Sequence, residues 1–243
     1  MRLFRLTLLR LTLLIVFLTG CNAMAGSSLR VLLIGNSHLA GNDVPGLLTQ
    51  LARNEDRKLV IESILRGGFT LENHWNSGDA LAMIRRGGWD AVVLQPQSLE
   101  AVEQTANYFK FVRLFNTEIR KTGARTLLHL AWARKDLGKP LELQPHWTKP
   151  TLEIASEIGA GVVPVGIAWT NSLSSFPELV LYSSDGNHAT LAGSYLAACT
   201  YYAAFYQKSP VSKPSPAGLA GVQTALQSSA WTAFNALEAD LRP

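Results

Sequence analysis

The sequence predicts an α/β fold, a three-layer α/β/α sandwich around a central parallel sheet. Two observations support this prediction. Short apolar runs of strand length alternate along the chain with longer stretches of helical periodicity. The chain has 243 residues, 47% of them hydrophobic, which is enough for one α/β domain with a full core. Such alternation places helices on both faces of a parallel sheet.

The expected elements follow in chain order. Strands are predicted over residues 29–34, 59–65, 89–94, 125–130 and 162–165, and helices over 43–57, 71–86, 100–121, 152–158 and 189–206. Residues 135–149 carry no clear periodicity, and we expect an irregular loop there that acts as a lid or specificity wall. Prolines follow the last of these helices, and residues 219–241 are expected to form one or two helices packed on the domain.

The N-terminus has the pattern of an export signal. Arg2 and Arg5 precede an apolar core over residues 11–18, and Leu18-Thr19-Gly20-Cys21 resembles the bacterial lipobox. That resemblance implies lipidation at Cys21 and a location in the bacterial cell envelope, periplasmic or extracytoplasmic. Cleavage after Ala25 would instead give plain secretion, and an uncleaved anchor is less favoured because the apolar core is short.

This division predicts a signal peptide over residues 1–21, a tether over 22–28, a main domain over 29–208 and a C-terminal extension over 209–243. The first twenty residues hold three arginines and no acidic residue, so without them the formal net charge falls from +4 to +1. The basic balance therefore gives no reason to expect nucleic acid as a partner. Contact with a membrane is expected only through the lipid anchor.

Candidate catalytic residues lie at two strand-to-helix junctions. Ser37 follows the first predicted strand, after Gly35, which we expect to permit a tight turn. A serine hydroxyl needs a base, and among five histidines His188 has an acid at close spacing, Asp185, just before the last helix of the main domain. Taken alone, Asp-x-x-His is a weak signal. The sequence shows no metal-ligand spacing and no glycine-rich phosphate loop, so no metal and no cofactor are expected.

Together these motifs resemble the first and last blocks of the SGNH/GDSL serine hydrolases. The resemblance covers residues 29–206 and implies a flavodoxin-like sandwich with a Ser37–His188–Asp185 triad. The middle blocks imply an oxyanion hole formed by the backbone N–H groups of Ser37 and Gly68 and by a side-chain amide. The family's asparagine is replaced here by Gln97, with Gln95 as its rival.

The first block also departs from the family pattern, because Asn36 stands where Gly-Asp-Ser has its acid. A bacterial branch with Gly-Asn-Ser is similar in this block, in residues 42–45 and in residues 92–95. We expect His38, Trp132 and Arg134 to line the substrate pocket. Arg134 could meet an anionic substrate or pair with Asp136.

Other candidate residues have simpler explanations. His129 lies within a predicted strand and is expected to be a core histidine, while His74 could lie at the rim of the site or in the core. Cys199 lies in an apolar run and is expected to be a buried thiol rather than a nucleophile.

The resemblance implies a serine esterase that hydrolyses O-acyl groups of a small molecule or glycan, such as O-acetyl groups of a carbohydrate. A lipid-directed esterase or lysophospholipase is the alternative within the enzyme class. A catalytically silent, glycan-binding lipoprotein with the same fold is the alternative outside it, and the glutamine in place of asparagine is the feature that favours silence.

Overall fold

A computed structural model describes residues 28–240 of the chain. The predicted signal peptide, Cys21 and residues 22–27 of the predicted tether lie outside the described residues. Within residues 28–240, no helix is both long enough and apolar enough to cross a membrane.

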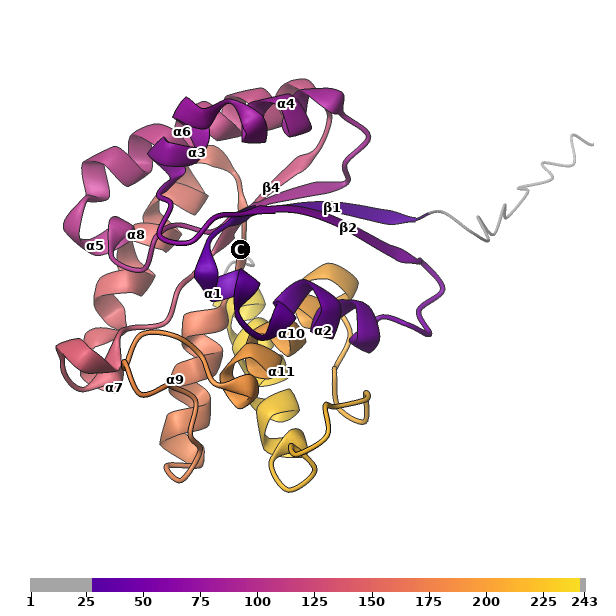
Figure 1. The fold of residues 1–243 in the computed structure, drawn as a ribbon, viewed down its shortest axis with the longest axis vertical. Helices are drawn as coiled ribbons and strands as arrows, with labels where there is room; N and C mark the ends of the chain where they lie inside the picture. Colours follow the sequence, from indigo (N-terminus) through magenta and orange to yellow (C-terminus); the bar gives the residue numbers. More distant parts are fainter. Residues whose placement is uncertain (1–27, 241–243) are drawn as a thin grey trace, which may run out of the picture.

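The centre of the structure is a parallel five-stranded sheet with the strand order β2-β1-β3-β4-β5 (Figure 1). The predicted strands are confirmed, with no end shifted by more than two residues: β1 Leu29–Gly35, β2 Leu59–Leu65, β3 Ala91–Leu94, β4 Arg125–His129 and β5 Gly161–Val163. Because β1 pairs with both β2 and β3, its end at Gly35 lies beside the loops that follow those two strands.

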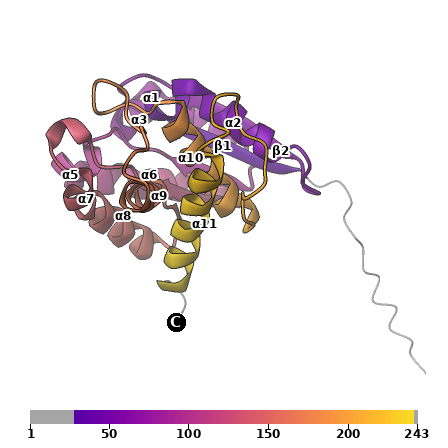
Figure 2. The same cartoon turned by 90° about the horizontal axis from the view of Figure 1, so that it is seen from below.

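Alternate residues of the strands enter two separate cores, as the period of a strand requires. On β1, Val31 and Leu33 join a cluster with the helices of one face, and Leu32 and Ile34 join a second cluster on the other. The first face is covered by α2 (Val44–Leu51), α9 (Val165–Ser175), α10 (Leu191–Tyr206) and α11 (Gln223–Asp240). The second face is covered by α3 (Leu71–Ser77), α4 (Asp79–Arg86), α6 (Thr105–Lys121) and α8 (Pro145–Ile158). Figure 1 shows the sheet between the two sets of helices, and Figure 2 looks onto the side that carries α9, α10 and α11. The predicted sandwich is confirmed.

Two predicted helices are interrupted. The expected helix over 71–86 is divided into α3 and α4 at Gly78, whose φ of 79° is left-handed. The expected helix over 100–121 is divided at Gln104 into α5 (Glu100–Glu103) and α6. The first predicted helix ends at Leu51 rather than near residue 57. Periodicity cannot detect such breaks, because the apolar spacing continues across them.

The prediction of an irregular loop over residues 135–149 is wrong. This stretch holds a 3₁₀ turn, η2 (Lys135–Leu137), the short helix α7 (Pro140–Leu143) and the beginning of α8. Proline lies in the first turn of both helices, where a missing N–H costs nothing, so these prolines begin helices rather than mark a loop. Helix α9 was not predicted; it begins after Pro164 without a side-chain cap.

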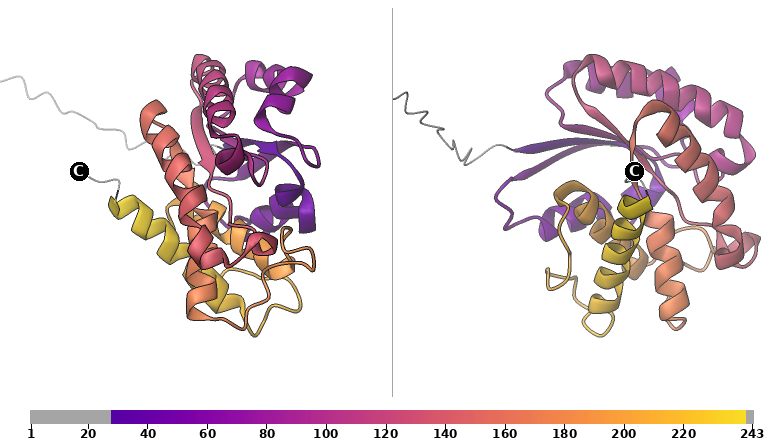
Figure 3. Two further views of the ribbon diagram at one scale, coloured as in Figure 1. Left: turned by 90° about the vertical axis from the view of Figure 1, so that its left-hand side faces the viewer. Right: turned by 180° about the vertical axis from the view of Figure 1, so that it is seen from behind.

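The expected C-terminal helical segment is a single helix, α11. It packs against α9 and α10, and Figure 3 shows it beside them on one face of the sheet. Two short elements follow β1 directly, α1 (Ser37–Ala40) and a 3₁₀ turn, η1 (Gly41–Asp43). They place Ser37 at the carboxyl ends of the parallel strands.

Candidate active site

Ser37 is the first residue of α1, directly beyond the end of β1. Asn36 is the N-cap of this short helix, and its side-chain oxygen accepts a hydrogen bond from the His38 N–H at 3.1 Å. The Ser37 N–H makes no hydrogen bond with any residue that the structure describes. Residues 35–38, which we call the nucleophile turn after the role predicted for Ser37, therefore present both a hydroxyl and a free backbone donor.

The amide of Asn36 joins the nucleophile turn to two neighbouring loops. Its Nδ2 donates to the carbonyl of Phe69 at 3.1 Å and to the carbonyl of Pro96 at 3.2 Å. An aspartate carboxylate could cap α1 equally well but could not donate to two carbonyls. The contacts explain why asparagine suits this position in Gly-Asn-Ser.

Gln95 supports the same turn from the interior of the protein. It is wholly buried; its Oε1 accepts the Asn36 N–H at 2.8 Å, and its Nε2 donates to the Pro96 carbonyl. A Cβ on Gly35 would lie 2.5 Å from that Oε1. Gly35 is therefore needed for room and not for a left-handed turn, which corrects the expectation from sequence.

The structure brings Ser37, His188 and Asp185 together. Ser37 Oγ lies 2.9 Å from His188 Nε2, and His188 Nδ1 lies 2.5 Å from Asp185 Oδ2. The side chains of His188 and Asp185 are 42% and 49% exposed, so the chain of contacts is open to a ligand. Hydrogen bonds from the imidazole and from the backbone N–H groups of Asn187 and His188 hold the pKa of Asp185 well below its usual range.

The turn that carries the acid and the histidine is fixed by its own backbone. Asp185 Oδ1 accepts the N–H groups of Asn187 and His188 at 3.0 and 2.9 Å. Gly186 has a φ of 68°, and a Cβ there would lie 2.7 Å from the backbone nitrogen of Asp136. The turn is therefore packed closely against η2, and only glycine satisfies both conditions.

Gly68 follows β2 with a φ of 72°, and a Cβ built there would meet nothing within 4 Å. The N–H of Gly68 makes no hydrogen bond with any residue between 28 and 240. The Phe69 carbonyl accepts from Asn36, so this loop is held against the nucleophile turn. Gly68 and Ser37 thus both offer unused backbone donors, on two loops that the Asn36–Phe69 bond holds together.

Gln97 differs from Gln95 in being partly exposed. Its Oε1 accepts the Leu99 N–H at 2.7 Å, while its Nε2 lies 3.2 Å from Ser98 Oγ. The bond from Leu99 fixes the orientation of the amide, because only the oxygen can accept it. The NH₂ end is therefore the part of Gln97 left for a ligand, whereas both ends of Gln95 are occupied in the interior.

The three predicted pocket residues do not share one role. Trp132 is wholly buried and His38 nearly so. His38 stacks on Trp132 with ring centroids 4.3 Å apart, and its Nε2 lies 3.2 Å from Asn187 Oδ1. Burial lowers the pKa of His38 to about 4, which keeps it neutral. Both residues support the turn that holds His188, since Trp132 Nε1 also donates to the Asn187 carbonyl at 3.0 Å.

Of the two roles considered for Arg134, contact with an anionic substrate and pairing with Asp136, the structure shows the pairing. Its Nε and Nη2 donate to the two carboxylate oxygens of Asp136 at 3.0 and 2.5 Å. Its Nη1 lies 3.4 Å from Ser98 Oγ. The guanidinium charge is thus already paired.

The remaining sequence candidates lie in the core. His129 is wholly buried, with Nδ1 2.7 Å from the Tyr201 hydroxyl, as expected. His74 is wholly buried as well, with Nε2 2.8 Å from the Gly35 carbonyl. Burial raises the pKa of the Cys199 thiol, which is inert in this setting. Within residues 28–240, no group of three or more His, Cys, Asp or Glu side chains is placed to hold a metal ion.

Sequence reasoning missed two residues near the site. Asn187 is the partner of His38, and the carboxylate of Glu100 is buried between the loops after β2 and β3. Asn187 lies inside the Asp-x-x-His motif and could have been considered from its position there. Glu100 gave no local signal for its contact with Leu71, 29 residues away.

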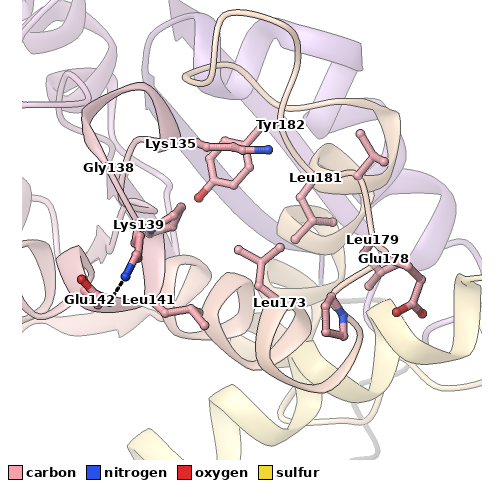
Figure 4. Close-up of a pocket in the computed structure, with 13 residues that line it drawn as sticks. Lys135, Gly138, Lys139, Leu141, Glu142, Leu173, Glu178, Leu179, Leu181 and Tyr182 are labelled. Carbon is pink, nitrogen blue, oxygen red and sulfur yellow. Dashed lines mark hydrogen bonds and ion pairs between the residues drawn. The ribbon is translucent and has the colours of Figure 1, made fainter.

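A cavity of about 590 Å³ is lined by residues of η2, α7, α9 and the segment 177–182. Figure 4 shows apolar side chains such as Leu173 and Leu181 in its wall, with Lys135 and Tyr182 at one end. Lys135 donates its N–H to the Gly186 carbonyl, and Tyr182 pairs with Ala189. Two residues that line the cavity thus bond to the Asp185–His188 turn or to the residue after it, but none of Ser37, Asp185 and His188 lines it.

Comparison with known proteins gives matches in structure only. No family model matches the sequence, and no curated protein matches it. A DUF4886 family protein from Bacteroides uniformis aligns with a TM-score of 0.72 and 22% identity over 86% of this chain and 95% of its own. A proposed SGNH hydrolase from Slackia heliotrinireducens aligns with a TM-score of 0.57 and 24% identity over 72% and 98%. An acetylxylan esterase from Geobacillus stearothermophilus aligns with a TM-score of 0.58 and 14% identity over 73% and 94%.

These neighbours share the parallel sheet and the helical layers with this chain. The similarity covers most of the length of each neighbour, so it concerns the whole domain rather than one motif. The resemblance of the sequence blocks and the similarity of the structures agree, and the chain has the fold of the SGNH/GDSL hydrolase superfamily.

Proposed function

We propose that the protein is a serine esterase that hydrolyses O-acyl esters through Ser37, His188 and Asp185. The observation that carries this proposal is the continuous chain from the Ser37 hydroxyl to the Asp185 carboxylate, with contacts of 2.9 and 2.5 Å. Such an arrangement activates a serine as a nucleophile. The neighbouring esterases of the same fold support ester hydrolysis as its use.

In this mechanism the Ser37 hydroxyl attacks the ester carbonyl while His188 Nε2 takes its proton. The Asp185 carboxylate holds the imidazole in place and stabilises the imidazolium. His188 then protonates the leaving alcohol. Water, activated by the same imidazole, releases the acyl group from Ser37 and restores the enzyme.

The oxyanion of the tetrahedral intermediate would be bound by the N–H groups of Ser37 and Gly68 and by the NH₂ of Gln97. Both backbone donors are unpaired within the described part of the chain. The Gln97 amide has only its NH₂ end free for this purpose. Each such donor contributes about 3–4 kcal/mol to transition-state stabilisation in serine hydrolases.

For the substrate, we propose a neutral O-acyl ester, such as an O-acetyl group on a carbohydrate, rather than a phospholipid. Arg134, which could have met an anionic substrate, is instead paired with Asp136 through two hydrogen bonds. Acetylxylan hydrolysis by a neighbour of the same fold agrees with this class of substrate.

A panel of substrates tests the proposal. We expect the wild type to hydrolyse p-nitrophenyl acetate and acetylated sugars faster than p-nitrophenyl esters of long fatty acids, and Ser37→Ala to hydrolyse neither. A preference for long acyl chains or lysophospholipids would favour the lipid-directed alternative. No turnover of any ester, with acetylated or deacetylated glycans still bound, would favour a silent binding protein.

We further propose that the protein acts in the bacterial cell envelope, attached through a lipidated Cys21. The lipobox-like sequence before Cys21 supports this proposal. Mass spectrometry of the mature N-terminus is expected to find a diacylated Cys21. A mature chain that begins at Gly26 would instead indicate cleavage after Ala25 and plain secretion.

A further inference from the structure

Glu100 is a buried carboxylate that joins two loops of the site. It is the first residue of α5 and is wholly buried. Its Oε1 and Oε2 accept the Leu71 N–H at 3.0 and 3.1 Å, and Oε2 also accepts the Gln97 N–H at 2.9 Å. Leu71 begins the helix after the Gly68 loop, and Gln97 lies in the loop after β3.

We propose that Glu100 is a positioning residue for the oxyanion hole, one that fixes the Gly68 donor and the Gln97 donor relative to each other. The inference rests on the proposed esterase function and adds to it a residue that does not touch the substrate. Each of the two donors lies within three residues of a backbone N–H that Glu100 binds.

The nucleophile turn is tied to the same two loops from its own side. Asn36 donates to Phe69 and Pro96, which neighbour Gly68 and Gln97 in the chain. Asn36 therefore fixes both loops relative to Ser37, and Glu100 fixes them relative to each other. Together these two side chains connect all three segments that carry the proposed donors.

Local helix capping does not account for Glu100. Its bond to the Gln97 N–H resembles half of a capping box, but the bond to Leu71 crosses 29 residues to another helix. An exposed glutamate could make the local bond without a desolvation cost. Burial, together with a smaller contribution from nearby Glu72, raises the pKa of Glu100 to about 7, although the hydrogen bonds from Gln97 and Leu71 lower it. Tyr108 is another titratable group close to Glu100. The fold therefore retains a costly buried carboxylate where an exposed cap would suffice.

The test compares Glu100→Gln with Glu103→Gln, which changes an exposed carboxylate of the same helix. Both carboxylate oxygens of Glu100 accept the Leu71 N–H, so glutamine keeps the size of the side chain but makes its NH₂ face that N–H, donor against donor. We expect kcat of Glu100→Gln to fall about tenfold or more with KM within about twofold, because misplaced donors matter only in the transition state. Glu103→Gln should match the wild type.

A second readout isolates the oxyanion hole. A boronic acid adds to Ser37 and places an oxygen where the oxyanion forms, so its affinity for Glu100→Gln should fall by a factor similar to the loss of kcat. A purely structural role would lower the melting temperature without separating kcat from KM. Equal kcat and equal boronic acid affinity in folded Glu100→Gln and Glu103→Gln would overturn the inference.

A pair of variants at Leu71 tests the same bond from the donor side if Glu100→Gln does not fold. Proline is tolerated at the first position of a helix, and Thr70 before it has the extended ψ of 170° that proline requires. Leu71→Pro removes the backbone N–H. Leu71→Ala removes most of the side chain but keeps the N–H. We expect a lower kcat for Leu71→Pro than for Leu71→Ala, and equal values would contradict the inference.

An active wild type with unaffected variants would refute only the role of Glu100, whereas an inactive wild type would refute the esterase proposal and the inference with it.

Discussion

His38 and His188 approach edge to face, with ring centroids 5.6 Å apart, yet only His188 faces the Ser37 hydroxyl. The His38 ring is stacked on Trp132 and directed at Asn187. Two histidines thus lie close to one serine, and their contacts assign them different tasks. His188 is placed to move protons, and His38 is placed to hold the turn that carries His188.

The first prediction separates these tasks. His188→Ala should lower kcat by about a thousandfold or more, and adding Ser37→Ala should not compound the loss, because the two groups act as a unit. Asp185→Asn should lower kcat less than either. His38→Ala should lower the free energy of unfolding by about 1–3 kcal/mol and kcat by less than about tenfold. The assignment would be reversed if steady-state kinetics showed that His38→Ala loses turnover while His188→Ala keeps most of it.

The second prediction concerns the pH dependence of stability. The pKa of His38 is lowered to about 4 in the folded protein from an ordinary value of 6.5, so the unfolded chain binds the proton more tightly. Its contribution to stability is complete above pH 6.5 and is lost as the pH falls through 4, by about 3 kcal/mol in all.

His38→Phe should keep a ring on Trp132 and remove this titration. Urea unfolding from pH 4 to pH 7 is therefore expected to show a shallower acid loss for His38→Phe than for the wild type. Other titrating groups, including Glu100, are common to both proteins and cancel in the comparison. Identical slopes would show that His38 does not titrate with a lowered pKa.

The third prediction addresses Gly-Asn-Ser. Asn36→Asp would place a buried carboxylate against the carbonyl oxygens of Phe69 and Pro96, which accept from the Asn36 amide. We expect a loss of about 3 kcal/mol or more in the free energy of unfolding, together with loss of activity. Asn116→Asp is the matched control, because Asn116 uses only its oxygen, as the acceptor of the Thr126 hydroxyl. Equal effects of the two substitutions, measured by denaturant unfolding, would contradict the proposed role of the Asn36 amide.

The fourth prediction distinguishes the two glutamines. Gln97→Ala should lower kcat about a hundredfold with little change in KM, because the oxyanion exists only in the transition state. Gln95→Ala should instead destabilise the protein by about 1–3 kcal/mol, since it leaves the Asn36 N–H unpaired in the interior. A fully folded Gln95→Ala without turnover, beside an active Gln97→Ala, would reverse the assignment.

Much of this fold could be predicted from the sequence, because its strands are short apolar runs whose limits coincide with changes in composition. The helix breaks at Gly78 and Gln104 and the helix after Pro164 could not, since they depend on packing rather than periodicity. The predicted loop over residues 135–149 contains Pro140 and Pro145, and each of these lies in the first turn of a helix, where proline is tolerated.

The candidate site also has features that the sequence predicts and features that it does not. Ser37, Asp185 and His188 could be found from motifs, because parallel topology brings loops at the carboxyl ends of strands together. The burial of Trp132 and His38 and the bond between Glu100 and Leu71 depend on contacts distant in sequence. No local pattern contains such contacts, so neither could be predicted from the sequence.

Reaction with a fluorophosphonate tests the central claim most directly, because the reagent is attacked only by an activated serine and requires no knowledge of the substrate. Mass spectrometry after proteolysis should find the phosphonate on the peptide that holds Ser37 in the wild type. The label should be absent from Ser37→Ala and strongly reduced in His188→Ala. A folded wild type that remains unlabelled, or that carries the label on a serine other than Ser37, would contradict the account.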